Sequence, residues 1–275
     1  MMIDAHFHIW QLARADYGWL TPETGSIYRD IGLADWRALS APCGVSAGVL
    51  VQAAPTEAET IFLLQQAAHA GDVCAVVGWT DLLAADAPQR IGALARHPKL
   101  RALRPMLQDI ADPDWILQDA LQPALHAMLA CDLTFDALVK PAHLARVAEL
   151  ARRYPGLRIV VDHAAKPDIS SSQWQGWAKE LAHLARAPQV WCKLSGLWTE
   201  APQGCAVEVL LPYARHVLDC FGAQRTLWGS DWPVLELAGA YASWHRLARQ
   251  LVLEMLGPQG PRGVFGAAAR AAYRL

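Results

Sequence analysis

The chain has 275 residues, of which 53% are hydrophobic and only 18% are charged, so it can build a large core. The formal net charge is −2 and there is no basic cluster, which argues against a nucleic-acid or anionic-membrane partner. No apolar run reaches the length of a membrane span, and Asp4 and His6 interrupt any secretory signal. The six cysteines form no C-x-x-C pair, which predicts reduced thiols in a cytoplasmic protein.

Apolar runs rich in β-branched residues recur along the chain and predict eight strands, the first at Ile3–His8. From the second run onward they begin about thirty residues apart, which is the length of one strand–helix unit. The other seven are Ala47–Ala53, Cys74–Thr80, Leu100–Leu107, Leu133–Val139, Arg158–His163, Val190–Ser195 and Arg225–Asp231.

The segments between these runs carry helix signals. Thr56 and Glu59 form a capping box before an apolar stripe. Asp112 and Pro113 predict a cap and a first-turn proline for a helix over Trp115–Leu129. Further helices are expected at Ala142–Tyr154 after Pro141, at Trp174–Ala187 after Ser171 or Ser172, at Val207–Phe221 before Gly222, at Ala240–Leu256 before Gly257, and at Val264–Tyr273 as a closing helix.

Eight strand–helix units without a linker predict one domain over residues 1–275, an α/β fold of the (β/α)8 TIM barrel type. The competing architecture is an open doubly wound sheet. It would require a glycine-rich turn after the first strand, where this chain has His8, Ile9 and Trp10. The segment 9–46 is unusually long and aromatic, and we expect it to form a loop and helix over the barrel mouth.

Polar residues end several of the predicted strands, and in a parallel barrel those ends meet at one mouth. His6 and His8 share a face of the first strand because strand side chains alternate with a period of two. One such histidine alone would favour a satisfied core residue, but two favour a metal ion or a polarised water. The other strand-end candidates are Gln52, Trp79, Asp81, Arg104, Lys140, Asp162, His163, Lys193, Ser195, Ser230 and Asp231.

Four motifs give the chain a family resemblance: His6–His8 (HFH), Asp162–Pro167 (DHAAKP), Cys192–Leu197 (CKLSGL) and Gly229–Pro233 (GSDWP). In this order they resemble the amidohydrolase superfamily over essentially the whole chain. Within it they resemble the TIM-barrel branch that includes L-fuconolactonase, L-rhamnonolactonase and 2-pyrone-4,6-dicarboxylate lactonase. Two more segments, Ala15–Trp19 and Val49–Ala53, resemble the sugar lactonases in particular.

The resemblance implies that His6, His8, His163 and Asp231 face one another as catalytic residues and as candidate ligands of one divalent ion. Three imidazoles and a carboxylate suit zinc. The branch also includes metal-independent members, in which fixed positive charges and the histidines would polarise the carbonyl.

Two departures from the family pattern argue against a binuclear metal centre. The Leu133–Val139 strand lacks the usual histidine, since His143 lies past Pro141. At the end of the fourth strand, Arg104 stands where a carboxylated lysine would bridge two ions.

Opening a lactone requires an activated water and a polarised carbonyl. Asp231 is the expected base, although an aspartate before Trp232 and Pro233 is also a common turn cap. Arg104 and Lys193 either contact the substrate or pair with a barrel carboxylate such as Asp136 or Asp81. The remaining expected substrate contacts are Trp10, Gln52 and Trp232, with the alternative that the tryptophans pack the barrel rim, and Asp4 is expected to support a histidine.

We therefore predict a cytoplasmic hydrolase, monomeric or homodimeric, that opens a small sugar-acid lactone by water attack on the ring carbonyl. One alternative is a metal-dependent decarboxylase of the same superfamily acting on an aromatic or dienoic acid. The missing fifth-strand histidine argues against it. The other alternative is a barrel that only binds, and the intact set of three histidines and Asp231 argues against that.

Overall fold

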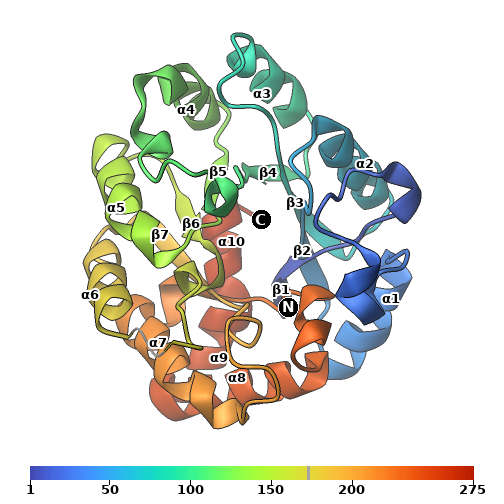
Figure 1. The fold of residues 1–275 in the computed structure, drawn as a ribbon, viewed down its shortest axis with the longest axis vertical. Coiled ribbons are helices and arrows are strands. Elements are labelled where there is room, and N and C mark those ends of the chain that lie inside the picture. Colours follow the sequence, from blue (N-terminus) through green and yellow to red (C-terminus); the bar gives the residue numbers. More distant parts are fainter. Residues whose placement is uncertain (172–173) are drawn as a thin grey trace.

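The computed structural model describes residues 1–171 and 174–275, and its eight parallel strands form a (β/α)8 barrel (Figure 1). The strands follow one another around the barrel in chain order, which confirms the predicted fold class. Their bounds are β1 Ile3–Phe7, β2 Ala47–Val51, β3 Val73–Gly78, β4 Leu100–Leu103, β5 Thr134–Ala137, β6 Ile159–Val161, β7 Val190–Leu194 and β8 Thr226–Trp228.

Every strand ends before the apolar run that predicted it. The predicted end is only slightly too late after β1 and β7, where His8 and Ser195 lie just outside their strands. It is furthest off after β4, where Arg104–Met106 form a loop before a 3-10 turn begins at Leu107. His163 and Asp231 also lie just past their strands. The residues expected in the site therefore leave the hydrogen-bonded ladder and turn into the loops of the barrel mouth.

The barrel is closed by the segment after β8 rather than by β8 alone. The Asp231 N–H donates to the His6 carbonyl at 2.8 Å, and the His8 N–H donates to the Trp232 carbonyl at 2.8 Å. Because these two bonds join β1 to the residues that follow β8, Asp231 is held directly beside the two leading histidines.

In the described part of the chain, nine α-helices, α1–α9, surround the barrel or follow its last strand. A tenth, α10, is seen at the centre of the barrel in Figure 1. A further segment, Gly263–Ala267, is a π-helical turn that leads into α10 (Ala268–Tyr273). The other bounds are α1 Leu33–Ser40, α2 Glu57–Ala68, α3 Ala87–Ala95, α4 Gln122–Ala130, α5 Leu144–Arg153, α6 Trp174–Leu184, α7 Leu211–Arg225, α8 Tyr241–Leu256 and α9 Gly260–Arg262. In the described part of the chain, no helix has the length and apolar character needed to cross a membrane.

Several helix signals are confirmed and one is wrong. The Glu59 N–H donates to Thr56 Oγ1 at 3.1 Å, as the capping box predicted, and Gly257 ends α8 with a φ of 67°. The helix expected over Trp115–Leu129 instead begins at Gln122, after two short 3-10 turns. Pro123 explains this start, because it lacks an N–H and its ring would clash with a preceding helical turn.

The predicted opening of the helix at residue 174 is only partly described. α6 begins at Trp174, while Ser172 lies outside the described residues.

Near the C-terminal end of α7 the backbone leaves helical geometry at Gly222, where φ is 59°. The glycine therefore ends the helix where the sequence predicted, because its missing Cβ permits this conformation.

Candidate active site

A cavity of about 340 Å³ lies at the mouth of the barrel, where the loops that follow the strands converge. One part of its wall is polar and ionisable, and the other is apolar and aromatic. The lining residues are His8, Trp19, Ala53, Arg104, Met106, Gln108, Asp109, Leu138, His163, Lys166, Asp231 and Val234.

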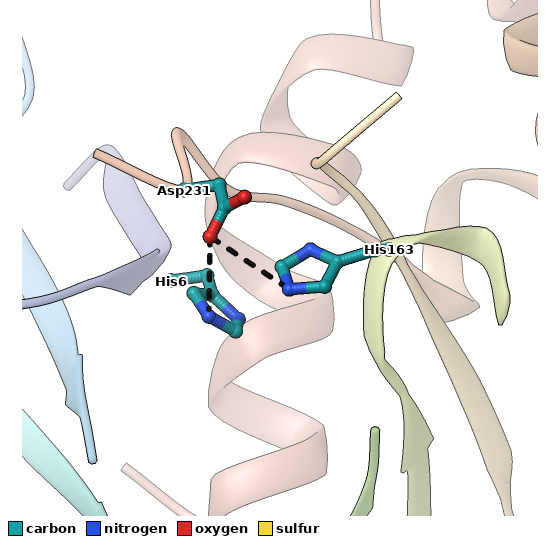
Figure 2. Close-up of side chains that lie close together, drawn as sticks. All are labelled: His6, His163 and Asp231. Atoms are coloured by element: carbon teal, nitrogen blue, oxygen red, sulfur yellow. Dashed lines mark ion pairs between the residues drawn. The ribbon is translucent and has the colours of Figure 1, made fainter. Parts of the chain in front are cut away.

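Three imidazole nitrogens surround a single carboxylate oxygen at the base of this cavity. The Asp231 Oδ1 atom lies 3.5 Å from His8 Nε2, 3.6 Å from His6 Nε2 and 3.7 Å from His163 Nε2. Figure 2 shows His6 and His163 approaching Asp231 from different elements. The structure thus brings together the four residues that the sequence assigned to catalysis, each at most 4% exposed.

An irregularity in β1 aims His6 into the site. The register with β2 shifts between Asp4 and Phe7, which is the signature of a β-bulge. Before the shift, Ala5 packs inside the barrel; after it, Phe7 stacks on Trp36 of α1 outside the barrel, at 4.2 Å between ring centroids. The bulge therefore lets His6, the neighbour of Ala5, point inward as well.

The same bulge overturns the expected position of Asp4. Its carboxylate accepts hydrogen bonds from Trp36 Nε1 at 3.1 Å, from the Tyr241 hydroxyl at 3.0 Å and from the Ser230 N–H at 2.8 Å. Asp4 consequently faces the outer helices and fixes the segment that carries Asp231, instead of supporting a histidine side chain.

The residues around His163 adopt an uncommon backbone conformation. His163, Ala164, Ala165 and Lys166 have φ values of 52°, 52°, 61° and 49°, and Asp231 has a φ of 59°. Left-handed geometry costs about 1–2 kcal/mol for each non-glycine residue. Such strain is typical of functional sites, where surrounding contacts hold residues in place.

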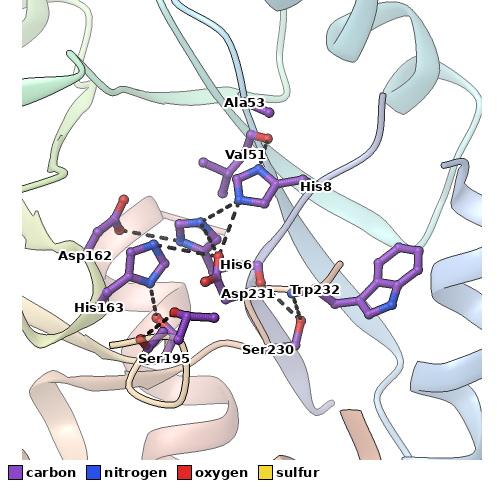
Figure 3. A network of polar contacts seen from close by, with 12 residues as sticks. His6, His8, Val51, Ala53, Asp162, His163, Ser195, Ser230, Asp231 and Trp232 are labelled. Atoms are coloured by element: carbon purple, nitrogen blue, oxygen red, sulfur yellow. Dashed lines mark hydrogen bonds and ion pairs between the residues drawn. The ribbon is translucent and has the colours of Figure 1, made fainter. Parts of the chain in front are cut away.

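The outer nitrogen of each imidazole has a defined partner (Figure 3). The His8 Nδ1 lies 2.8 Å from the Val51 carbonyl, and the His163 Nδ1 lies 2.9 Å from Ser195 Oγ. Gly196 has a φ of 64°, and a Cβ built there would lie 2.6 Å from the His163 ring. The glycine of the CKLSGL motif is therefore required both by its backbone angle and by its contact with His163.

Burial and mutual contacts set the charges in this cluster. Burial lowers the pKa of His163 to about 4, although the nearby Asp231 and Asp162 carboxylates oppose the change. Burial alone would raise the pKa of Asp231, but His163, His8 and His6 together hold that pKa below its usual range. At neutral pH the cavity therefore contains a neutral His163 beside an ionised Asp231.

Lys193 and Arg104 form a charged layer beneath the cluster. Lys193 Nζ lies 2.7 Å from Asp136 Oδ2 and 2.8 Å from Asp162 Oδ1, and Arg104 Nη1 lies 3.0 Å from Asp162 Oδ2. Lys193 is completely buried, so its expected contact with a substrate is replaced by the alternative of pairing with Asp136. Arg104 also pairs with a carboxylate, yet it lines the cavity.

The other three expected substrate contacts are buried away from the cavity lining. Trp10 Nε1 donates to the Arg29 carbonyl at 2.8 Å, and Trp232 Nε1 donates to Glu236 Oε1 at 2.7 Å. Gln52 Nε2 donates to the Arg104 carbonyl at 2.9 Å. Because these groups are satisfied within the protein, they support the loops of the mouth, as the alternative for the tryptophans proposed.

Other residues form the wall of the cavity, and one of them, Trp19, belongs to the aromatic segment that was expected to cover the mouth. Trp19, from the long loop after β1, donates to the Ala53 carbonyl at 2.8 Å and stands edge-on to Trp10. Lys166 was part of a recognised motif, and its ammonium lies 3.0 Å from Glu200 Oε1. Only the aromatic character of the 9–46 segment indicated such a wall beforehand, and its action as a lid remains a prediction.

The donor set of the cluster fits a divalent cation. His6, His163 and Asp231 each offer a ligand atom within 4.8 Å of the others, and His8 Nε2 lies 3.1 Å from His6 Nε2. Tetrahedral ligands at zinc distances are about 3.3 Å apart, and the contacts of Asp231 Oδ1 with the three imidazoles, at 3.6, 3.5 and 3.7 Å, are close to that value. β5 supplies Asp136 and no histidine, and the His143 ring contacts the Lys140 backbone at 3.1 Å.

Comparisons with known proteins match this chain over nearly its whole length. The family model described as Amidohydrolase matches residues 3–275. An L-fucono-1,5-lactonase of Burkholderia ambifaria is 50% identical over 276 residues, covering 99% of this chain and 95% of that protein. An L-fucono-1,5-lactonase of Burkholderia multivorans is 34% identical over 290 residues, covering 100% and 96%.

A solved structure extends the agreement to the whole fold. The crystal structure of an amidohydrolase from Burkholderia multivorans with bound zinc has a TM-score of 0.94 and 33% identity, covering 100% of this chain and 99% of that one. The family match spans nearly every residue, and residues of the HFH, DHAAKP and GSDWP motifs line one cavity. This chain therefore belongs to the amidohydrolase family.

Proposed function

We propose that this protein hydrolyses a small sugar-acid lactone, with a 1,5-lactone such as L-fucono-1,5-lactone as the first candidate. The observation that carries the proposal is the convergence of three imidazole nitrogens on Asp231 Oδ1 at the base of a cavity. The names of the two relatives support lactone chemistry. A cavity of about 340 Å³ with polar and apolar walls suits a single sugar ring.

In the proposed reaction, Asp231 takes a proton from the attacking water while its Oδ1 remains among the imidazoles, so we assign proton uptake to Oδ2. The guanidinium of Arg104 lines the same cavity and stabilises the negative charge that develops on the carbonyl oxygen. His163 orients the carboxylate from 3.7 Å. When the ring carbon–oxygen bond breaks, Asp231 returns its proton to the departing oxygen, which leaves a hydroxy acid.

We also propose that one divalent ion, zinc in the first place, is held by His6, His8, His163 and Asp231. When bound, such an ion supplies a Lewis acid that polarises the carbonyl and acidifies water. The ligand atoms of His6, His163 and Asp231 lie within 4.8 Å of one another, and His8 Nε2 lies 3.5 Å from Asp231 Oδ1, which supports this proposal. The zinc in the related Burkholderia multivorans structure supports it as well. Removal of metal by chelation should abolish turnover; full activity in metal-free protein would assign polarisation to Arg104 instead.

The decarboxylase alternative gains no support from the site. β5 (Thr134–Ala137) places Asp136 beside Lys193, where that alternative requires a histidine. The six cysteines are free thiols, which fits the predicted cytoplasmic location. The predicted role in carbohydrate metabolism depends on the proposed sugar-acid substrate. Location, pathway and the choice between monomer and homodimer remain predictions.

A lactone panel tests the proposed function directly. Purified protein is mixed with sugar-acid 1,4- and 1,5-lactones in weakly buffered pH indicator, and product mass is recorded. We expect proton release with gain of one water and no carbon dioxide. Folded protein that releases no proton from any member of the panel would reject the proposal, and release of carbon dioxide from an aromatic acid would favour the decarboxylase.

A further inference from the structure

The imidazole of His6 has a polar neighbour on each ring nitrogen. Its Nδ1 lies 3.1 Å from Lys193 Nζ, and its Nε2 lies 3.1 Å from His8 Nε2. At the far end of this row, His8 Nδ1 lies 2.8 Å from the Val51 carbonyl. Figure 3 shows His8 between His6 and Val51. The four groups form a continuous row from the barrel interior to the cavity.

The two ends of the row fix the direction of each hydrogen bond. A carbonyl only accepts, so His8 carries a proton on Nδ1. An ammonium only donates, so His6 Nδ1 must present a lone pair to Lys193. This contact excludes both the Nδ1–H form of His6 and its imidazolium. The proton of His6 then lies on Nε2, which faces His8 Nε2 at 3.1 Å.

We propose that Lys193 is a positioning residue that sets His6 as the Nε2–H tautomer. In the metal-free protein, His6 then donates a hydrogen bond within the site and does not offer the lone pair that a metal ligand needs. The inference concerns the proton of His6 and not the substrate, so it does not depend on lactone hydrolysis.

Lys193 is held firmly enough for this task. Its ammonium contacts Asp136 at 2.7 Å and Asp162 at 2.8 Å, and the Tyr273 hydroxyl of α10 donates to Asp136 at 2.8 Å. All four side chains are buried. The hydrogen bonds of the ammonium go to Asp136 Oδ2 and to His6 Nδ1, while Asp162 Oδ1 contributes an ion-pair contact at 2.8 Å.

Among the residues that the structure describes, Arg104 is the one further cationic side chain beside His6. Its Nη1 lies 3.5 Å from His6 Nε2, at the limit of hydrogen bonding, but only 3.0 Å from Asp162 Oδ2. Nη1 carries two hydrogens, and the shorter contact directs one of them to the Asp162 carboxylate. The other reaches His6 Nε2 only at 3.5 Å, which is weaker than the 3.1 Å contact of Lys193 with His6 Nδ1. His6 Nε2 therefore remains free to donate to His8.

Asp162 lies beside the same His6 ring and favours the other tautomer, in which the proton is on Nδ1. An ion that binds through His6 Nε2 must displace the proton, and the Asp162 Oδ1 atom lies 3.6 Å from His6 Nδ1 on the other side. If Lys193 no longer donates to Nδ1, the proton can sit on Nδ1 instead of Nε2. Asp162 Oδ1 then faces the Nδ1–H group and favours that form. Lys193 and Asp162 thus favour opposite tautomers of His6.

Nitrogen NMR of the intact, chelator-treated protein tests the assignment without any substrate. With 15N-labelled histidine rings, long-range proton–nitrogen spectra distinguish Nε2–H, Nδ1–H and imidazolium forms, and loss of a signal in His6→Asn identifies His6. We expect the Nε2–H form in the wild-type protein at neutral pH. Either of the other two forms would overturn the inference.

Three variants then test the role of Lys193. Lys193→Met removes the donor and should convert His6 to the Nδ1–H form, while Lys193→Arg keeps a donor and should retain Nε2–H. Lys179→Met, on the exposed face of α6, is the matched control and should leave the spectrum unchanged. Persistence of Nε2–H in Lys193→Met would show that Lys193 does not set the tautomer.

Lys193→Met leaves Asp136 as a buried unpaired charge, which threatens folding. The double variant Lys193→Met/Asp136→Leu removes the pair together, and its circular dichroism is compared with that of the wild type. The same change to Nδ1–H is expected in this background. Retention of Nε2–H there would again reject the role of Lys193, and lactone turnover does not enter either result.

Discussion

The two ends of this barrel are built in different ways. At the N-terminal end, α10 places Ala268, Ala269 and Ala272 against inward-facing strand residues, and Tyr273 binds Asp136. At the mouth, His163–Lys166 and Asp231 account for five of the eight described non-glycine residues with positive φ. One end therefore gains stability from regular packing, while the other holds strained backbone around ionisable groups. Substitutions at the two ends should accordingly affect different measurements.

The largest effect is expected for Asp231→Asn at the mouth. Asparagine tolerates the left-handed backbone but cannot take the proton of water, so kcat/KM for the lactone should fall about 1,000-fold or more. The free energy of unfolding should change little. Steady-state kinetics and urea unfolding check both parts, with Asp219→Asn on the surface of α7 as control. Near-normal turnover would remove Asp231 from the base role.

A pH-dependent contribution to stability is expected from Glu59, which supports the mouth from α2. Its carboxylate accepts the N–H groups of Ala53 and Ala54, and burial raises its pKa to about 7. A carboxyl group with a raised folded-state pKa favours folding at low pH, and this contribution is lost as pH rises from about 4.5 to about 7. The loss amounts to about 3 kcal/mol.

Urea unfolding of wild type and Glu59→Gln across this pH range measures that contribution. The stability of the wild type relative to the variant should fall as pH rises, because the variant cannot titrate at this position. Glu254→Gln, at an exposed position of α8, should instead run parallel to the wild type. Parallel curves for Glu59→Gln would place the pKa of Glu59 near its ordinary value.

Gly196→Ala should damage the mouth without replacing an ionisable group. The new Cβ would lie 2.6 Å from the His163 ring and would also strain a φ of 64°. We expect kcat/KM to fall about 10- to 100-fold because small displacements of reacting groups are costly. Gly92→Ala, inside α3 with open space around it, is the matched control and should slightly stabilise the protein. Equal kinetics for both variants would contradict the packing argument.

The smallest effect on activity is expected at the closed end. Tyr273→Phe removes the hydroxyl that donates to Asp136 while Lys193 remains in place. Loss of one buried hydrogen bond should cost about 1–2 kcal/mol of unfolding free energy. Turnover should stay within about threefold because the ion pair that contacts His6 is kept. A large loss of kcat with unchanged stability would extend the active site to α10.

The strands show which structural features the local sequence pattern predicts and which it does not. Apolar runs located all eight strands with starts within one residue, because burial on both faces demands continuous apolar sequence. Their ends were placed too late, since residues such as Arg104 and His163 follow the runs directly but belong to loops. Pro123 redirected one helix start, and that signal was present in the sequence.

The candidate site also combines features that the sequence predicted with features that it did not. Motif order was enough to predict that His6, His8, His163 and Asp231 would meet, because parallel strand ends must converge when a barrel closes. The bulge in β1 was not predictable, since it depends on how β1 pairs with β2, and it sent Asp4 to the outer helices. Whether Trp10, Trp19 or Trp232 reached the cavity was likewise decided by the loops around them.

The sequence by itself determined the barrel, its closing helix and the set of residues at its mouth, because periodicity and strand-end position are local properties of the chain. The tertiary structure alone decided which charges pair and which nitrogens face one another. Lys193 became a partner of Asp136, Asp162 and His6 through contacts between strands far apart in sequence. Such contacts depend on register and side-chain direction, which no local pattern specifies.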